Sequence, residues 1–314
     1  MRCIAEIIKD GNINELEDAI KKGINVNEVY TNSENETPIF YSSYVQTKLL
    51  IEAGANVNHL NVDNQNALFF LDYSFYHDTD NMHLDKYKKL KLLIDNNINV
   101  KQLTSNGENF LFFTNLNIDF LKMCENLNVN LKHINNDGEN LFFVLNDFYK
   151  FKETREYLIT KGLDLFKENN NGENLLFVEN SNGNPQLIEY YLEKGFDINK
   201  KNNAGQTALM KIKSAPVRHF LIDNNIDIHA VCNNGKNALD YCFNSEKIVR
   251  KLLNKNIEIL QPENYYKTEP VASKMIEKKR IEYLILKTNL EKESIAKALK
   301  NNNREINNIS IKRI

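Results

Sequence analysis

Residues 169–177 read NNNGENLLF, residues 135–143 read NNDGENLFF, and residues 104–112 read TSNGENFLF. One chain thus repeats nearly the same nine residues three times. In every copy an Asn stands directly before a run of apolar residues. The side-chain oxygen of Asn can accept a hydrogen bond from the free backbone N–H groups at the start of a helix. The stretch therefore predicts that a helix begins after this Asn.

The position of this Asn recurs along the chain. Thr or Asn precedes an apolar run at seven places: Thr37, Asn66, Asn109, Asn140, Asn174, Thr207 and Asn237. Both residue types can cap a helix, and Pro38, which follows the first of them, suits the first helical position. Each copy is therefore predicted to open with a helix.

A second pattern of four residues recurs further along each copy and begins with Gly or Asn. Its copies are GINV at 23, GANV at 54, NINV at 97, NLNV at 126, GLDL at 162, GFDI at 195, NIDI at 225 and NIEI at 256. Gly and Asn tolerate the left-handed conformation that ends a helix. An amphipathic stretch precedes most copies, which predicts a second helix with one apolar face.

The repeating unit is therefore a helix, a short turn, a second helix and an extended turn. The successive Gly/Asn positions are 31, 43, 29, 36, 33, 30 and 31 residues apart. A period of this size is typical of stacked helical arrays, in which each unit packs on its neighbours.

The pattern resembles the ankyrin repeat. The typical sequence of that repeat contains, in chain order, a Gly turn, Thr-Pro-Leu-His, a Leu-rich second helix and Gly-Ala-Asp-Val-Asn. The nearest copies are ETPIF at 36–40, GANVN at 54–58, GFDIN at 195–199 and GQTALM at 205–210. The resemblance covers residues 1 to about 260 and implies an all-α solenoid of about eight helix–turn–helix repeats. It also implies a non-enzymatic protein that binds another protein through a concave groove.

The chain departs from that family pattern in two ways. The family His, which ties neighbouring turns by hydrogen bonds, is replaced by Phe40, Phe69, Phe112, Phe143 and Phe177. We therefore expect these repeats to depend more on apolar packing. Thr37 to Gly54 and Asn109 to Asn126 span only 17 residues, which predicts shortened or irregular first helices.

The chain divides into three predicted regions. Residues 1–30 form an N-terminal capping repeat, residues 31–260 form the array, and residues 261–314 form a C-terminal helical cap. An insertion at 72–83 lengthens the third copy. In the C-terminal cap, residues 270–287 and 290–302 are predicted to form two amphipathic helices.

Composition narrows the classes of partner. The 40 basic and 42 acidic residues nearly balance, so no net positive field favours nucleic acid or an anionic membrane. No apolar run reaches the roughly 20 residues of a membrane span. The four cysteines, Cys3, Cys124, Cys232 and Cys242, form no CxxC pair, and we interpret them as reduced, mostly structural thiols in the cytoplasm. We expect a monomer.

No catalytic motif appears in the sequence, and no cofactor is expected. The alternative function is a metal-binding or catalytic role of the 72–83 insertion, where His77, Asp78, Asp80 and His83 could supply zinc ligands. A solvated polar loop explains the same residues. His59, His133, His219 and His229 are interpreted as structural or exposed.

The predicted partner-binding residues form a stripe, four positions after each capping residue. They are Tyr41, Phe70, Phe113, Val144, Val178, Lys211 and Tyr241, and Tyr73, Phe75 and Tyr76 of the insertion could extend them. The geometry of the ankyrin family implies that this position faces the groove, and exposed aromatic residues often mark interfaces. The alternative is that shortened first helices rotate these side chains into the core.

A second set of contact candidates is polar. Asn136, Asp137, Asn170, Asn171, Asn203, Asn233 and Asn234 lie at the tips of successive turns. They could offer hydrogen bonds to a partner, or they could serve only as turn formers. The sequence leaves open whether the chain acts on its partner as an inhibitor or immunity protein, as a host-directed effector or as a scaffold.

Overall fold

The computed structural model describes residues 2–30, 34–71, 82–145, 147–178, 183–261 and 270–311. It divides into two compact units, Met1–Asn182 and Gly183–Ile314, which are treated separately below. The described residues form 13 α-helices, four short 3-10 helices and no named strand. The fold is therefore all-α, as the sequence predicts.

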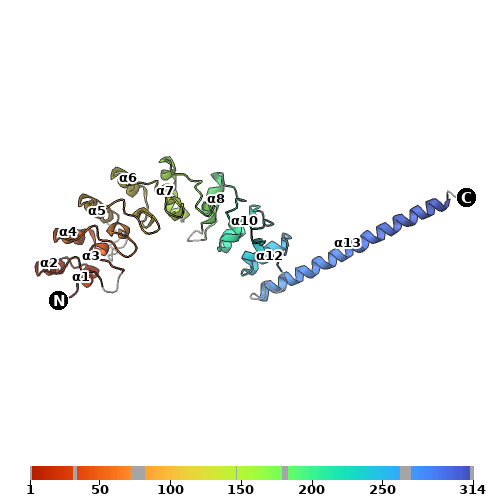
Figure 1. The fold of residues 1–314 in the computed structure, drawn as a ribbon, viewed down its shortest axis with the longest axis horizontal. Helices are drawn as coiled ribbons and strands as arrows, with labels where there is room; N and C mark the ends of the chain where they lie inside the picture. The colour runs from red at the N-terminus through yellow and green to blue at the C-terminus, as the bar shows by residue number, and fades with distance from the viewer. Residues whose placement is uncertain are drawn as a thin grey trace. The chain divides into compact units, whose positions relative to one another are not determined.

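The first unit consists of five pairs of helices in chain order, followed by one short helix. The pairs are α1 (Ile4–Asp10) with α2 (Ile13–Lys21), α3 (Pro38–Tyr41) with α4 (Tyr44–Glu52), η1 (Ala67–Phe70) with α5 (Met82–Asp95), η2 (Phe110–Phe112) with α6 (Ile118–Asn126), and η3 (Leu141–Val144) with α7 (Phe148–Thr160); the last short helix is η4 (Leu175–Phe177). In Figure 1 the second helices α2, α4 and α5 lie side by side, and α6 lies beside α7.

The second unit continues the same alternation. It contains α8 (Gln186–Glu193), α9 (Ala208–Lys211), α10 (Ala215–Asp223), α11 (Ala238–Cys242), α12 (Glu246–Asn254) and α13 (Pro270–Ile311). The short helices α9 and α11 contact each other, and α10 contacts α12. Short helices thus pack on short helices and long helices on long ones, as in a stacked array.

The seven predicted capping residues each precede a helix of one turn. These helices contain three to five residues, so the prediction of shortened, irregular first helices is confirmed. Nearly all of the three residues that follow each cap are buried. Of the five substituted residues, Phe112 is half-buried and the core contains Phe40, Phe69, Phe143 and Phe177. Apolar packing thus replaces the hydrogen bonds that a His would make at these positions.

The second helices end in a left-handed residue, as the Gly/Asn pattern predicts. Gly23, Gly54, Asn97, Asn128, Gly162, Gly195, Asn225 and Asn256 have φ between 58° and 96°. In the fourth copy this residue is Asn128, so the left-handed residue predicted at Asn126 is wrong by two residues. The apolar residue that returns to the core after the turn is Val129, which is buried. With this correction, the spacings of 29 and 36 residues become 31 and 34.

The five Asn caps make the predicted hydrogen bond. The Oδ1 atoms of Asn66, Asn109, Asn140, Asn174 and Asn237 accept from the N–H two residues further on, at 3.0–3.2 Å. Four of these amides also donate to the turn after the second helix. The Nδ2 atom of Asn140, for example, lies 2.8 Å from the carbonyl oxygen of Asp164. One amide therefore joins the two ends of a helix pair.

The two Thr caps differ from this prediction. Thr37 and Thr207 make no side-chain capping bond, and their buried hydroxyl oxygens have no hydrogen-bond partner. A Thr side chain is shorter than Asn and carries a single polar atom, so it cannot bridge the same two groups.

Long polar side chains satisfy the carbonyl groups at the other ends of the one-turn helices. Such short helices leave most of their carbonyls without an intrahelical donor. The Lys89 amine donates to the carbonyl oxygens of Phe40 and Ser42, at 3.3 and 2.8 Å. Arg155 and Arg218 donate similarly to Leu145 and Tyr241. All three cationic side chains belong to second helices and are buried.

The C-terminal region forms one continuous helix, so the prediction of two helices at 270–287 and 290–302 is wrong. Thr288 and Asn289 are weak helix formers, but neither breaks a helix as Pro would. Helix α13 contacts α12 through its first turns, where Ala272 and Ile276 are buried. Every side chain from Ile281 to Lys297 is exposed.

Candidate functional site

The predicted stripe lies at the boundary between core and solvent. In most copies the three residues after the capping residue are buried, and the fourth is partly or fully exposed. Tyr41, Phe70, Val144, Val178 and Tyr241 are half-buried, whereas Phe113 (38%) and Lys211 are exposed. The positions Tyr73, Phe75 and Tyr76 lie outside the described residues.

Aromatic rings connect neighbouring copies in the first unit. The ring of Tyr41 stacks on Tyr30, with centroids 6.4 Å apart, and meets the edge of Phe70 at 5.4 Å. Phe113 makes an edge contact with Phe69, also at 5.4 Å. Each of these stripe rings thus packs on a neighbouring ring and keeps part of its surface accessible to solvent.

Two residues next to the stripe were missed by the sequence analysis. Tyr30 extends the ring series toward the N-terminus, and burial raises the pKa of its hydroxyl well above the usual range, so Tyr30 stays neutral. Glu36 accepts a hydrogen bond from the Tyr41 hydroxyl at 2.5 Å. A Glu at the residue before the cap was the available signal, because Glu recurs there at 108, 139 and 173.

The second unit presents a different surface at the same positions. Tyr241 packs on a small buried cluster of Met210, Ala230 and Cys232. Its hydroxyl lies 3.4 Å from the Cys232 sulfur. Burial and this thiol raise the pKa of Tyr241. Burial opposes ionisation of Cys232, but the Tyr241 hydroxyl and backbone N–H groups outweigh it and lower the pKa of the thiol. Because Cys232 is buried, the pair is a packing element rather than an accessible nucleophile.

The Asn residues at the turn tips bind neighbouring turns. The Asn136 N–H donates to the Asn106 carbonyl at 2.9 Å, and the Asn136 amide donates to Ser105. Asn170 and Asn233 make the equivalent pairs of bonds to the preceding turn. These three amides are engaged within the chain, which favours the turn-forming interpretation over direct contact with a partner.

Two histidines also tie adjacent turns together. Nε2 of His59 lies 2.7 Å from the Asn35 carbonyl oxygen, and Nε2 of His133 lies 2.6 Å from that of Gly107. A carbonyl only accepts, so each Nε2 carries the proton. The turn-tying hydrogen bonds therefore persist in two copies, from a different position than in the family pattern.

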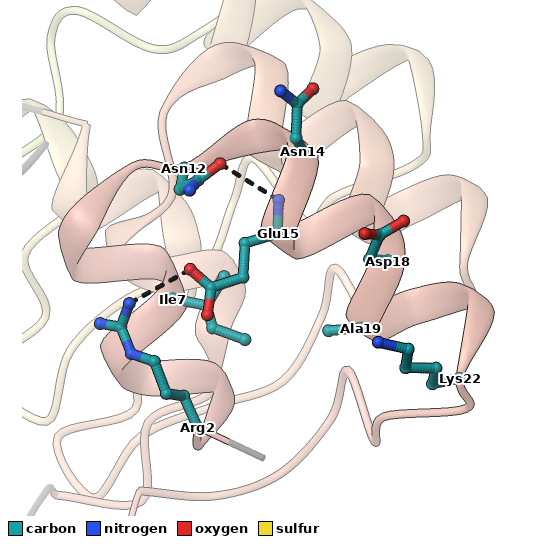
Figure 2. A pocket seen from close by; sticks show the side chains of 8 residues that line it. All are labelled: Arg2, Ile7, Asn12, Asn14, Glu15, Asp18, Ala19 and Lys22. Atoms are coloured by element: carbon teal, nitrogen blue, oxygen red, sulfur yellow. Dashed lines mark hydrogen bonds and ion pairs between the residues drawn. The ribbon is translucent and has the colours of Figure 1, made fainter.

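A shallow pocket of about 450 Å³ lies beside helices α1 and α2 (Figure 2). It is lined by Arg2, Ile7, Asn12, Asn14, Glu15, Asp18, Ala19 and Lys22. Arg2 donates to the Glu15 carboxylate at 3.1 Å, and Asn12 caps α2 through the Glu15 N–H. Two charged groups of this pocket, Arg2 and Glu15, thus pair with each other.

Candidate metal ligands do not gather in the part of the chain that the structure describes. No group of three or more His, Cys, Asp or Glu side chains that could hold a metal ion occurs there. His77, Asp78 and Asp80 lie outside the described residues, as does the side chain of His83. All four cysteines are free thiols. Burial raises the pKa of Cys124 to about 12 and that of Cys242 to about 11, as expected of structural cysteines.

Among the described helices, none combines the length and apolar composition needed to cross a bilayer. Comparison with protein families matches residues 176–262 to ankyrin repeats, in three copies. No curated protein matches the chain.

Proposed function

We propose, on the premise that residues 176–262 are ankyrin repeats, that this chain is a non-enzymatic module that binds a partner protein. Ankyrin repeats suggest protein–protein interaction, and the family match brings no catalytic domain. The complex would act through surface complementarity, as an inhibitor, a host-directed effector or a scaffold. A cytoplasmic location and a monomeric free state belong to the same proposal.

The proposal extends the repeat to about eight copies, of which the first is the capping repeat at residues 1–30 and the others form the array at residues 31–260, with residues 261–314 as the C-terminal cap. Eight left-handed Gly or Asn residues at the ends of second helices support this count. Seven of the helix pairs are opened by a Thr or Asn cap. The first pair, α1 and α2, lacks the family turn motif, as a terminal repeat does in a solenoid.

The observation that carries the proposal is the exposure pattern of the stripe. Tyr41, Phe70 and Phe113 lie beside fully buried neighbours and still retain solvent-accessible surface. Partly exposed aromatic residues held rigidly by packing have the properties of interface anchors, because little side-chain entropy is lost when a partner covers them. The proposed partner-binding set keeps Val144, Val178, Lys211 and Tyr241, along with Tyr73, Phe75 and Tyr76.

A pull-down with the full chain as bait tests the proposal. Phe113→Ala removes an exposed stripe ring, and Phe166→Ala removes a ring that is also exposed (53%) but lies outside the stripe. We expect a specific partner to be lost with Phe113→Ala and kept with Phe166→Ala, because an anchor contributes about 2 kcal/mol or more. Thermal melting of both variants controls for folding. A partner retained equally by both folded variants contradicts the assignment of the stripe.

A further inference from the structure

The near-neutral charge of the chain hides a strong division between its two units. Residues 1–182 carry 17 basic and 27 acidic residues, a formal net charge of −10. Residues 183–314 carry 23 basic and 15 acidic residues, a net charge of +8. A divided charge of this size affects which partners each unit attracts. The whole chain has almost no net charge, and this argued against nucleic acid or an anionic membrane as a partner. Each unit taken alone, however, carries a large net charge.

In the first unit the negative charge is concentrated in the turns that precede the capping residues. In the first unit these turns are residues 34–37, 61–66, 104–109, 135–140 and 168–174. They contain eight acidic residues and no Lys or Arg: Glu34, Glu36, Asp63, Glu108, Asp137, Glu139, Glu168 and Glu173. In the second unit, the equivalent turns at 201–207 and 232–237 contain Lys201 and Lys236 and no acidic residue.

The acidic turns are held next to the aromatic stripe. The hydrogen bond from the Tyr41 hydroxyl to Glu36 joins a stripe ring directly to a turn carboxylate. The backbone bonds Asn136 N–H to Asn106 and Asn170 N–H to Asp137, at 2.9 and 2.7 Å, hold successive turns in a fixed row. Glu34, Asp63, Asp137 and Glu168 are exposed on this row.

This surface specifies the charge of its partner. Carboxylates on successive turns of this row repel one another, and a cation placed among them relieves the repulsion. The partly exposed rings of Tyr41, Phe70 and Phe113 offer faces on which Lys or Arg side chains can lie, as well as apolar contact area. Both features favour a basic segment with apolar residues and disfavour an acidic one.

Within the proposed partner-binding function, on which this inference rests, we infer that the stripe and acidic turns of residues 34–178 bind a Lys- and Arg-rich segment of the partner protein. The basic residues contact the turn carboxylates, and the apolar residues contact the rings. The second unit, with Lys201, Lys211 and Lys236 at equivalent positions, does not share this preference.

The inference is tested by measuring, through fluorescence anisotropy, how two labelled peptides bind to the full chain. One peptide alternates lysine and leucine, and the matched peptide alternates glutamate and leucine. The test variant Glu34→Gln/Asp63→Asn/Asp137→Asn/Glu168→Gln removes the four exposed turn charges. The control variant Asp18→Asn/Glu52→Gln/Asp95→Asn/Glu153→Gln removes four exposed charges from α2, α4, α5 and α7. Both variants change the net charge of the first unit equally, and both are checked for an unchanged melting temperature.

We expect the lysine peptide to bind and the glutamate peptide not to bind. The turn variant should weaken binding of the lysine peptide about tenfold at low salt and should reduce the salt dependence of binding. The control variant should weaken binding less than about threefold. The reason is that charges close to the peptide act more strongly than distant charges, which salt screens. Equal weakening by the two variants, or no binding of the lysine peptide, overturns the inference. A pull-down partner that depends on Phe113 but not on the turn charges leaves the proposed function standing and rejects the basic segment.

Discussion

The one-turn helices of this protein fall into two classes, which differ at the residue before the helix. Five begin after an Asn whose amide accepts from the helix start, and in four of these the amide is also seen to donate to the turn at the far end of the helix pair. Two begin after Thr37 or Thr207, whose hydroxyls are buried without a partner. The comparison indicates that an Asn cap stabilises these short helices more than a Thr cap does.

The Thr-capped helix α3 is supported instead at its other end. Lys89 of α5 is buried, and its amine donates to the carbonyl oxygens of Phe40 in α3 and of Ser42 directly after it. Burial lowers the pKa of this amine from its ordinary value of 10.5 to about 7. Because burial disfavours the charged form of this amine, the stability of this helix pair depends on pH, whereas an amide cap does not titrate.

The largest expected effect is therefore the pH dependence that Lys89 confers. Between about pH 7 and 10.5 the unfolded state binds more protons than the folded state, so the free energy of unfolding rises with pH in this window. We expect a gain of roughly 2 kcal/mol from pH 7 to pH 9. Lys89→Met should flatten this rise in urea unfolding experiments, and the exposed Lys91→Met should not. An unchanged slope in Lys89→Met contradicts the prediction.

Converting an Asn cap to the Thr class should have the next largest effect. Asn140→Thr leaves the Asp164 carbonyl without its donor and weakens the cap on the Phe142 N–H. We expect a loss of about 2 kcal/mol in the free energy of unfolding. Asn171→Thr, at an exposed position in the next turn, serves as the control. A loss of similar size in both variants would mean that the bridge does not stabilise the pair.

The reverse exchange should stabilise the second unit. Thr207→Asn introduces an amide at the start of α9, where it can accept from the Leu209 N–H and donate to the Asp227 turn, as at the other Asn caps. We expect the free energy of unfolding to increase by about 1 kcal/mol. A decrease would show that the site near Thr207 has no room for the longer side chain.

The smallest expected effect comes from removing the buried hydroxyl of Thr207, which has no hydrogen-bond partner. Thr207→Val has nearly the same shape and removes only the buried oxygen that lacks a partner. Val is normally a poor cap, but here no side-chain capping bond exists to be lost. We expect a gain of about 0.5 kcal/mol by thermal unfolding. Destabilisation would indicate a hydrogen bond to solvent at this hydroxyl.

The abundance of Asn has a structural basis that composition alone did not suggest. Every described non-glycine residue with positive φ is an Asn: Asn35, Asn64, Asn97, Asn128, Asn225 and Asn256. Other Asn residues cap helices, and Asn27 and Asn58 bridge neighbouring turns with one donated and one accepted bond each. The same residue type thus performs three tasks, because its short amide both donates and accepts and tolerates the left-handed conformation.

The sequence by itself determined the local features of this protein. The starts of the one-turn helices and the left-handed helix ends follow from the steric and hydrogen-bonding properties of single residues, so they could be predicted from Asn140 or Gly162 alone. The left-handed residue of the fourth copy was predicted at Asn126 rather than Asn128 because the two residues are chemically identical, and the burial of Val129 favours Asn128.

Only the tertiary structure decided which distant groups meet. The amide of Asn140 finds the Asp164 carbonyl, and Lys89 reaches Phe40, because stacked helices bring together residues far apart in sequence. The exposure of Tyr41, Phe70 and Phe113 and the row formed by the acidic turns arise in the same way. A residue's type limits the bonds it can make, but its neighbours in space determine which of them form.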